Sequence, residues 1–438
     1  MNLADLRKHS LRTTRTLWNL LILALVATLI VGSAVAGVER DALLPVGVPE
    51  ENGLSSARLN LLSEFLKAEV ERMKTPGATL LVARNGRIVY EDAFGYQDKV
   101  TGTPMRKDSL FRIYSMTKPI TSRGVMMLLE KGKLLLTDPI ERYIPAFKDV
   151  KVAVVNEDDS EIVGLESPNR SITIQDLLRQ TSGLTYGFFG KRTAVRKAYI
   201  AGQAKMRGAD LRTAVDRLAE LPLIAHPGTR WEYSYSTDVL GRLIEVVSGK
   251  KLSTYFKEEI FEPLGMHDTG FYIPEGQLHR AAQGYDPKTG DYPALLTDVT
   301  KPPVFESGGG GLVSSMYDYA RFCQLILNGG ELDGVRLVSR TTVELMSADH
   351  LSEKVAPGDL YMPGPGQGFG LGFAVRRSVG VSGFLGSKGE IRWSGMAGTA
   401  FWIDPVEQLI CIWMIQDVPQ SNHYRQRFKN LVYQAIID

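Results

Sequence analysis

The spacing of hydrophobic and polar positions predicts strands near both ends of the chain. Apolar residues between 59 and 70 recur at helical spacing, so we expect an amphipathic helix there. Segments 79–83 and 87–93 have the composition of strands, and Asn85-Gly86 between them favours a tight hairpin turn. The pattern also predicts a C-terminal helix over residues 422–437, preceded by strands at 370–375, 391–394, 399–404 and 409–415.

Helical patterns dominate the middle of the chain. A run over residues 119–130 reads as a helix, and apolar residues at 240, 243, 244 and 247 give a second helix one apolar face that ends at Ser248. Gly249 then stands where a helix commonly ends. Residues 151–169 are polar and acidic, and we interpret them as a surface loop.

This order of elements predicts a mixed α/β (α+β) fold. It consists of an antiparallel sheet built from both chain ends and flanked by helices, with an inserted, mostly α-helical lobe. About 400 residues suit one large domain of this kind. We expect the domain to span 50–438, with the sheet lobe at about 50–111 and 341–438 and the helical lobe at about 112–340.

The first 36 residues have the features of an export segment. A basic stretch precedes an apolar run that begins at Leu20, and Ala34-Val35-Ala36 is an acceptable cleavage site. The apolar stretch continues to Val38, which is long enough to span a bilayer if it is not cleaved. Residues 1–36 are therefore a signal peptide or a membrane anchor, and both alternatives place the rest of the chain outside the cytoplasmic membrane, as in a periplasmic protein.

Charge and cysteine content narrow the class of protein. The sequence has 51 Lys and Arg against 49 Asp and Glu, and residues 1–36 hold four of the former and one of the latter, so the remainder is nearly neutral. Without a basic block, nucleic acid is an unsuitable partner. The two cysteines, Cys323 and Cys411, lie in apolar runs, and we expect buried free thiols rather than a disulfide.

Ser115-Met116-Thr117-Lys118 is the strongest candidate for chemistry. Residues three apart share a helix face, so Lys118 can reach the Ser115 hydroxyl and assist its deprotonation. The other Ser-x-x-Lys, from Ser248 to Lys251, crosses a predicted helix end and lacks this geometry.

Other hydrolytic sites are missing from the sequence. No serine has glycine at both −2 and +2, so the Gly-x-Ser-x-Gly elbow is absent. There is no His-Glu-x-x-His and no paired-cysteine zinc spacing. The histidines are scattered, and we interpret them as surface or structural residues. The pattern predicts no metal site.

Several motifs together resemble the serine β-lactamase and penicillin-binding-protein superfamily, particularly its class C-like branch and the related family VIII esterases. The resemblance runs from about Leu59 to the C-terminus. It rests on Ser115-Met-Thr-Lys118-Pro119, Leu177-Leu-Arg-Gln-Thr-Ser-Gly-Leu184, Pro227-Gly-Thr-x-Trp231-x-Tyr233-Ser-Tyr235, Glu262-Pro-Leu-Gly-Met266, the glycine run 308–311 and Gly368-Phe-Gly-Leu-Gly372.

The resemblance implies an acyl-enzyme mechanism with no metal or organic cofactor. Ser115 would be the acylated nucleophile, Lys118 would ease its deprotonation and Tyr233 would be the second base, its phenolate stabilised by the neighbouring ammonium charge. The backbone N–H groups of Ser115 and Met396 would form the oxyanion hole.

Two departures from the family pattern bear on the substrate. Tyr235 stands where β-lactamases of this branch have asparagine, and Trp393-Ser394-Gly395 stands where they have Lys-Thr-Gly. The cation that receives a β-lactam carboxylate is thereby lost, and Trp393 offers an apolar wall. We expect Tyr235, Trp393, Ser394 and Gly395 to contact substrate, with Gly395 letting the strand approach it closely.

These motifs predict an exported serine hydrolase that cleaves, or transfers acyl groups from, small esters. The partner is then a small-molecule ester or acyl donor, and the membrane is a partner only through an uncleaved N-terminal segment. A class C-like β-lactamase and a D-alanyl-D-alanine carboxypeptidase are the alternatives among enzymes. An inactive cell-envelope binding protein of the same fold is the alternative outside them.

Overall fold

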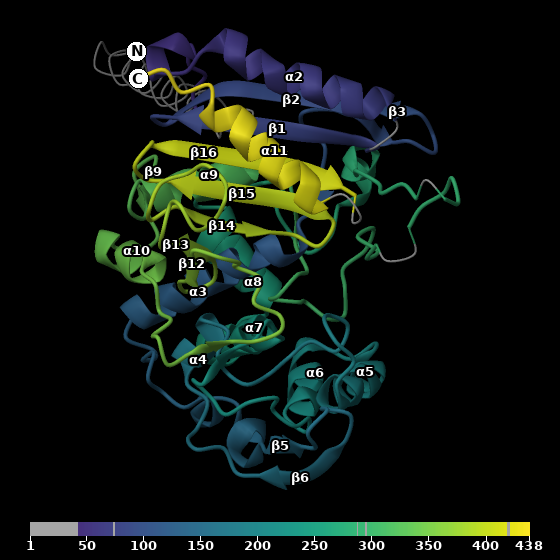
Figure 1. Cartoon of the computed structure of the whole chain (residues 1–438), viewed down its shortest axis with the longest axis vertical. Helices are drawn as coiled ribbons and strands as arrows, with labels where there is room; N and C mark the ends of the chain where they lie inside the picture. The colour runs from purple at the N-terminus through teal and green to yellow at the C-terminus, as the bar shows by residue number, and fades with distance from the viewer. Residues whose placement is uncertain (1–42, 73–74, 287, 294–295, 418–420) are drawn as a thin grey trace, which may run out of the picture. The chain divides into compact units, whose positions relative to one another are not determined.

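A computed structural model describes residues 43–72, 75–286, 288–293, 296–417 and 421–438 (Figure 1). The predicted signal peptide or anchor at 1–36 lies outside the described residues. Residues 44–438 form one compact unit. Within the described ranges, no helix combines the length and the apolar character that crossing a bilayer requires.

An eight-stranded antiparallel sheet forms the centre of this unit, with the order β12-β13-β14-β15-β16-β1-β2-β3. The C-terminal strand β16 pairs with the N-terminal strand β1, from Ala78 opposite Ile415 to Arg84 opposite Leu409. The sheet is therefore assembled from both ends of the chain, as predicted. Its strands are β1 (Gly77–Arg84), β2 (Arg87–Asp98), β3 (Thr103–Pro104), β12 (Gln367–Phe369), β13 (Ala374–Arg376), β14 (Ile391–Ser394), β15 (Gly398–Asp404) and β16 (Leu409–Gln416).

Helices cover both faces of the sheet, which is why β1 and β16 are buried along their whole length. On one face, α2 (Ser56–Glu71) and α11 (Ser421–Tyr433) lie side by side (Figure 1) and enclose a core that includes Leu62, Trp413 and Phe428. On the other face, α9 (Met316–Leu327) packs against β16 and β1. The mixed α/β fold with helices flanking an antiparallel sheet is confirmed.

Four of the remaining helices pack around α7. This helix, Ser236–Ser248, contacts α3, α4, α6 and α8. It ends at Gly249, whose φ of 73° confirms the predicted helix end. The other α-helices are α3 (Thr117–Glu130), α4 (Ile174–Leu178), α5 (Ala194–Met206), α6 (Leu211–Leu218), α8 (Leu252–Phe256) and α10 (Arg340–Ser347).

Short elements connect these helices. Single helical turns are η1 (Glu50–Asn52), η2 (Tyr114–Met116), η3 (Ile140–Arg142), η4 (Pro145–Asp149), η5 (Lys257–Phe261) and η6 (Glu275–Arg280). Two-stranded pairs are β4 (Phe111–Arg112) with β8 (Val313–Ser314), β5 (Val152–Val155) with β6 (Ile162–Glu166), β7 (Arg230–Trp231) with β11 (Ala356–Pro357), and β9 (Glu331–Leu332) with β10 (Val335–Arg336).

Two element predictions are wrong. Residues 151–169 were expected to form a loop, but they contain the hairpin of β5 and β6. Val152 is buried and Ile162 packs against the core, but Val163 and Leu165 are exposed, so the apolar residues of this hairpin do not mark a single buried face in the sequence. The strand expected at 370–375 begins only at Ala374, where β13 starts, and residues 370–373 form the turn after β12, because Gly372 has a φ of 107° that no extended strand adopts.

Both cysteines are buried free thiols, as predicted. Cys323 lies on α9 and Cys411 on β16, in contact with the apolar residues around them.

Candidate active site

A strained residue places Ser115 at the start of α3. The chain leaves β4, makes the single turn η2 and enters α3 at Thr117. Tyr114 has a φ of 43°, a left-handed conformation that costs free energy for any residue with a side chain. Its hydroxyl accepts a hydrogen bond from the backbone N–H of Thr297 at 3.2 Å. Ser115 therefore lies in the turn immediately before the helix.

Lys118 contacts Ser115 from the first turn of α3. Its side chain is almost completely buried, and its Nζ donates hydrogen bonds to Ser115 Oγ at 3.3 Å, to the Gly309 carbonyl at 2.7 Å and to the Tyr186 hydroxyl at 3.2 Å. The same Nζ lies 4.5 Å from the centre of the Tyr233 ring. Ser115, Lys118 and Tyr233, which the motifs predict, are thus brought together, and the lysine contacts the tyrosine through its ring.

Tyr233 lies between β7 and α7, enclosed by aromatic rings. The Trp231 ring stacks parallel to it at a centroid distance of 6.1 Å, and the Trp393 ring lies at 5.5 Å. Trp393 Nε1 donates to the Tyr233 hydroxyl at 3.4 Å. Packing on several sides restricts the ring to one position, with its hydroxyl directed towards β14.

Gln180 fixes the backbone that carries Tyr233. Its side-chain Oε1 accepts hydrogen bonds from the N–H of Ser234 at 3.1 Å and from Ser234 Oγ at 2.9 Å. Its backbone carbonyl accepts from the N–H of Glu232 at 2.9 Å. Gln180 itself has a φ of 61°, so this left-handed residue must be held by its neighbours.

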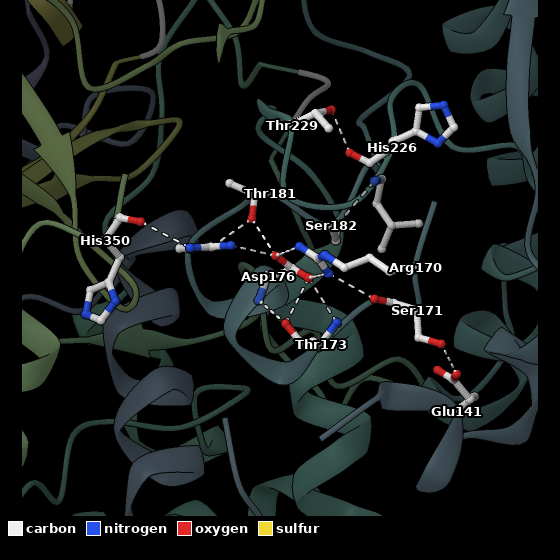
Figure 2. Close-up of polar contacts among 12 residues, drawn as sticks. Glu141, Arg170, Ser171, Thr173, Asp176, Thr181, Ser182, His226, Thr229 and His350 are labelled. Carbon is white, nitrogen blue, oxygen red and sulfur yellow. Dashed lines mark hydrogen bonds and ion pairs between the residues drawn. The ribbon is translucent and has the colours of Figure 1, made fainter. Parts of the chain in front are cut away.

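The support for Gln180 comes from the polar network around Asp176 (Figure 2). The buried Asp176 carboxylate accepts hydrogen bonds from Arg170, Arg179, Thr173 and Thr181. Burial raises the pKa of this carboxyl, but the hydrogen bonds led by that of Arg170 outweigh burial and hold the pKa below its usual range. Asp176 also completes the capping box that starts α4. The motif 177–184 thus positions Tyr233 through Gln180, and none of its residues lines the cavity at Ser115.

Sequence reasoning missed Asp238, which contacts the same glycine, Gly309, as Lys118 does. The Asp238 side chain, on α7, is buried and accepts hydrogen bonds from Ser307 Oγ at 2.5 Å and from the N–H of Gly309 at 3.1 Å. Burial raises the pKa of this carboxyl, and the charge of Lys118 opposes the rise. Gly309 therefore joins the two residues, because its N–H contacts Asp238 and its carbonyl accepts from Lys118.

This arrangement explains the glycine run. A Cβ at Gly309 would lie 2.5 Å from Asp238 Oδ2, and a Cβ at Gly308 would lie 2.7 Å from the carbonyl of Thr237. Only glycines allow the run to approach α7 this closely. In the sequence Asp238 lies opposite the apolar face of the predicted helix, on the side of Arg242 and Glu245, so no local pattern distinguishes it from a solvated carboxylate.

The end of β14 forms the opposite wall of the site. A Cβ at Gly395 would lie 2.4 Å from the carbonyl oxygen of Ile113, so glycine is required for β14 to approach the segment that leads to Ser115. Met396 follows Gly395, and the described residues supply no hydrogen-bond acceptor for its N–H. This N–H is available to a bound molecule, and Met396 and Ser115 line the same cavity.

That cavity has a volume of about 630 Å³. Ser115, Tyr233, Trp393, Ser394, Gly395 and Met396 all line it, so most of the predicted site residues share one space. Tyr235 is not among the lining residues. Its ring packs against Tyr186 at a centroid distance of 4.5 Å. Within the described part of the chain, no group of three or more His, Cys, Asp or Glu side chains is arranged to hold a metal ion.

A match to a family model shows to which protein family the chain belongs. Residues 63–434 match the model described as Beta-lactamase. The chain belongs to the β-lactamase family. It is a serine hydrolase of that family. The chain is similar to esterase EstB of Burkholderia gladioli. The two are 31% identical over 378 residues, which cover 80% of this chain and 87% of EstB.

Other similar proteins are described in different ways. An uncharacterised protein of Mycobacterium tuberculosis is 37% identical over 357 residues, covering 78% of this chain and 86% of the relative. A putative D-alanyl-D-alanine carboxypeptidase of Escherichia coli is 27% identical over 407 residues, covering 85% of each chain. Among solved structures, EstCE1, a hydrolase with promiscuous acyltransferase activity, superimposes with a TM-score of 0.72 over 86% of this chain and 99% of EstCE1, at 24% identity. That likeness shows the fold.

Proposed function

We propose that this chain is an exported esterase and acyltransferase that acts on small esters through an acyl-enzyme on Ser115. The observation that carries the proposal is the contact of Ser115 Oγ with Lys118 Nζ at 3.3 Å, in a cavity walled by Tyr233 and Trp393. A serine hydroxyl is a weak nucleophile, and an adjacent basic group activates it. The similarity to esterase EstB supports the ester as substrate class.

In the acylation step, Ser115 Oγ forms a bond to the ester carbonyl carbon, and the bond from that carbon to the alcohol oxygen breaks. The hydroxyl proton passes through the Lys118 and Tyr233 pair to the departing alkoxide, which leaves as a neutral alcohol. In the second step, water attacks the acyl-enzyme, the acid is released and Ser115 recovers its proton. A second alcohol in place of water gives acyl transfer.

The negative charge that develops on the carbonyl oxygen requires hydrogen-bond donors. We assign this role to the backbone N–H groups of Ser115 and Met396. The N–H of Met396 has no acceptor among the described residues, which suits a donor kept for the substrate. Asp238 and Gly309 act as positioning residues, because the Gly309 carbonyl accepts a hydrogen bond from Lys118 and Asp238 fixes Gly309 through its N–H.

Trp393 supports an ester rather than a β-lactam as substrate. It occupies the strand position at which the sequence pattern of β-lactamases has lysine, and its indole N–H points to the Tyr233 hydroxyl at 3.4 Å. An indole offers apolar surface and one donor, so it does not neutralise an antibiotic carboxylate at this position. Export rests on the sequence of residues 1–36 and is tested by the N-terminal residue of protein recovered from the cell envelope.

The test compares two substrates and two serine variants. Initial rates are measured on p-nitrophenyl butyrate and on a chromogenic cephalosporin for the wild type, Ser115→Ala and Ser248→Ala. Ser248 belongs to the other Ser-x-x-Lys of the sequence and lies at the end of α7, so it is the matched control. We expect Ser115→Ala to lower kcat/KM on the ester by about 10³-fold or more and Ser248→Ala to leave it within twofold.

The cephalosporin distinguishes the alternatives. Cephalosporin turnover that equals or exceeds ester turnover, and that is lost in Ser115→Ala, would make the protein a β-lactamase. Ester hydrolysis that persists in Ser115→Ala would remove Ser115 from the mechanism. If neither substrate acylates Ser115, as judged by the mass of the intact protein, the chain is an inactive member of the fold.

A further inference from the structure

Three separate segments of the chain form adjoining parts of the cavity wall at Ser115. Phe189 belongs to the segment between α4 and α5, Tyr233 follows β7, and Tyr361 belongs to the segment between β11 and β12. The ring centres of Phe189 and Tyr233 lie 6.1 Å apart. Those of Tyr361 and Trp231, which belongs to β7, lie 5.2 Å apart. The width of the cavity therefore depends on how these three segments are held together.

A buried ion pair contacts all three segments. Arg196 on α5 and Glu232, the residue before Tyr233, are each only 1% exposed, and Arg196 Nη2 donates to Glu232 Oε1 at 2.6 Å. Arg196 Nη1 donates to the carbonyl of Lys191 at 3.2 Å and lies 3.6 Å from the Asp359 carboxylate. Each contact is made within two residues of an aromatic side chain of the wall, whereas Arg196 and Glu232 themselves do not line the cavity.

The same segments pack closely around the pair. A Cβ at Gly190 would lie 2.9 Å from Arg196 Nη1 and 2.9 Å from a side-chain carbon of Leu360, so a glycine is needed where these segments meet the guanidinium. A Cβ at Gly358 would likewise lie 2.5 Å from Glu232 Oε2. A shift of either charged side chain is therefore passed on to the backbone of the segments that carry the aromatic wall.

This ion pair is better suited to fixing positions than to stabilising the fold. The desolvation of two buried charges offsets most of their attraction. The pair also leaves Arg196 Nε and Glu232 Oε2 buried without a hydrogen-bond partner among the described residues, which costs further free energy. A planar guanidinium, by contrast, directs its hydrogen bonds in fixed directions, here to Glu232 and to the carbonyl of Lys191.

We infer that Arg196 and Glu232 are positioning residues that hold the cavity wall in place and thereby limit the size of the ester that reaches Ser115. The inference rests on the proposed ester hydrolysis at Ser115 and adds size selectivity to it. Because the pair does not line the cavity, it acts on the substrate only through the aromatic side chains of the wall. Without the pair, the three segments separate more easily and a bulkier ester fits beside Ser115.

The experiment compares esters that differ in bulk on one side of the reacting bond. The acyl group is varied between p-nitrophenyl butyrate and p-nitrophenyl 3,3-dimethylbutyrate, and the alcohol between phenyl butyrate and 1-naphthyl butyrate. For each pair of esters, the ratio of kcat/KM for the small ester to that for the bulky ester is measured in the wild type, Arg196→Met and Arg196→Lys. Arg280→Met is the matched control, because Arg280 is also buried, pairs with Asp268 at 2.5 Å and lies outside the cavity wall.

We expect Arg196→Met to lower the ratio by about tenfold or more for at least one of the two pairs of esters, since size discrimination by a close-fitting pocket is of that order. Arg196→Lys keeps the charge but not the fixed directions of the guanidinium, so it retains part of the selectivity. Arg280→Met leaves both ratios unchanged. Each ratio compares two substrates on one sample, so it does not depend on the fraction of a variant that is folded.

A double variant keeps the test valid if Arg196→Met does not fold. The single change leaves the Glu232 carboxylate buried without its partner, which is strongly destabilising. Arg196→Met combined with Glu232→Met removes both charges, and apolar side chains of similar volume commonly preserve a fold in place of a buried ion pair. The double variant should show the same loss of selectivity as Arg196→Met.

Other results overturn the inference. Ser115-dependent hydrolysis with wild-type ratios in Arg196→Met and in the double variant leaves the proposed function intact and contradicts the role of the pair. Ratios that fall as far in Arg280→Met as in Arg196→Met also contradict it, because any loss of stability would then relax the cavity. If no ester is hydrolysed in a Ser115-dependent way, the proposed function itself fails, and the limit on its substrates fails with it.

Discussion

At the scale of single residues, the site depends on a buried carboxylate that does not touch substrate. Asp238 holds Gly309 and Ser307, and Gly309 in turn accepts a hydrogen bond from Lys118. A negative charge in an apolar environment acts over longer distances than in water, because the effective dielectric constant is low. Asp238 therefore fixes the position of Lys118 through Gly309, and its charge attracts the Lys118 ammonium.

We predict that Asp238→Asn lowers kcat for ester hydrolysis by about tenfold or more, which corresponds to ~1.4 kcal/mol in the barrier. The amide keeps one oxygen acceptor but loses the charge opposite the Lys118 ammonium. The pH dependence of kcat/KM should also change at its acid end, because burial raises the pKa of the Asp238 carboxyl and the amide that replaces it does not ionise. Stopped-flow rates between pH 5 and 10 measure both effects.

Asp216→Asn is the control for this experiment, since Asp216 is an exposed carboxylate of α6. A loss of activity in Asp238→Asn that is fully explained by a lower melting temperature, with an unchanged pH profile, would reduce Asp238 to a structural residue.

The residues of the site differ in how far the sequence could predict them. Ser115, Lys118 and Tyr233 stand in short motifs whose spacing carries information. Asp238 and Tyr186 contribute contacts that arise only when α7 and the segment after Gly183 fold against α3. The alternation rule predicts opposite faces for Arg392 and Trp393, but no local pattern predicts that one cavity reaches both.

At the scale of elements, long periodic segments were predictable and short ones were not. The helix now seen as α3 and the end of α7 at Gly249 follow from apolar periodicity and a helix-ending glycine. The hairpin of β5 and β6 exposes some of its apolar residues and buries others, and β12 and β13 are three residues each, so neither leaves a clear pattern. Tertiary packing, rather than propensity, determines these elements.

The element that matters most for the chemistry is the end of β14. A Cβ at Gly395 would lie 2.3 Å from Thr399 Oγ1 and 2.4 Å from the carbonyl of Ile113, and a backbone carbonyl cannot move out of the way easily. We predict that Gly395→Ala displaces Met396 from Ser115 and lowers kcat/KM by about 10²-fold, as small misplacements in active sites do. Ester kinetics measure this loss.

A matched glycine is available as the control for β14. Gly276 lies in η6, and a Cβ at this position would meet no described atom within 4 Å, so Gly276→Ala should leave kcat/KM within about twofold. Near-normal activity of Gly395→Ala would mean that β14 does not set the distance between Met396 and Ser115.

At the scale of the whole molecule, the sheet joins chain ends that are more than three hundred residues apart, and α9 seals its inner face. The start of α9 carries a second buried carboxylate. Asp318 accepts hydrogen bonds from the N–H of Asp268 at 2.7 Å and from Thr269 Oγ1 at 2.8 Å. Burial, followed by repulsion from Asp268, raises the pKa of Asp318 to about 7, although Arg280 opposes the rise.

This shift makes the stability of the whole fold depend on pH. The native protein keeps a proton on Asp318 between about pH 4 and pH 7, whereas the unfolded chain releases it near pH 4, so this group's contribution to stability falls as pH rises through that window.

In Asp318→Asn the amide oxygen still accepts from Asp268 and Thr269 and does not ionise. The free energy of unfolding of Asp318→Asn relative to wild type should therefore rise from pH 4.5 to pH 7.5, by up to about 3 kcal/mol, since one pKa unit corresponds to ~1.4 kcal/mol. Urea unfolding at the two pH values measures the difference, and Asp149→Asn, an exposed carboxylate at the end of η4, should show no such change. A difference between Asp318→Asn and wild type that stays constant with pH would mean that Asp318 is ionised in the native protein throughout this range.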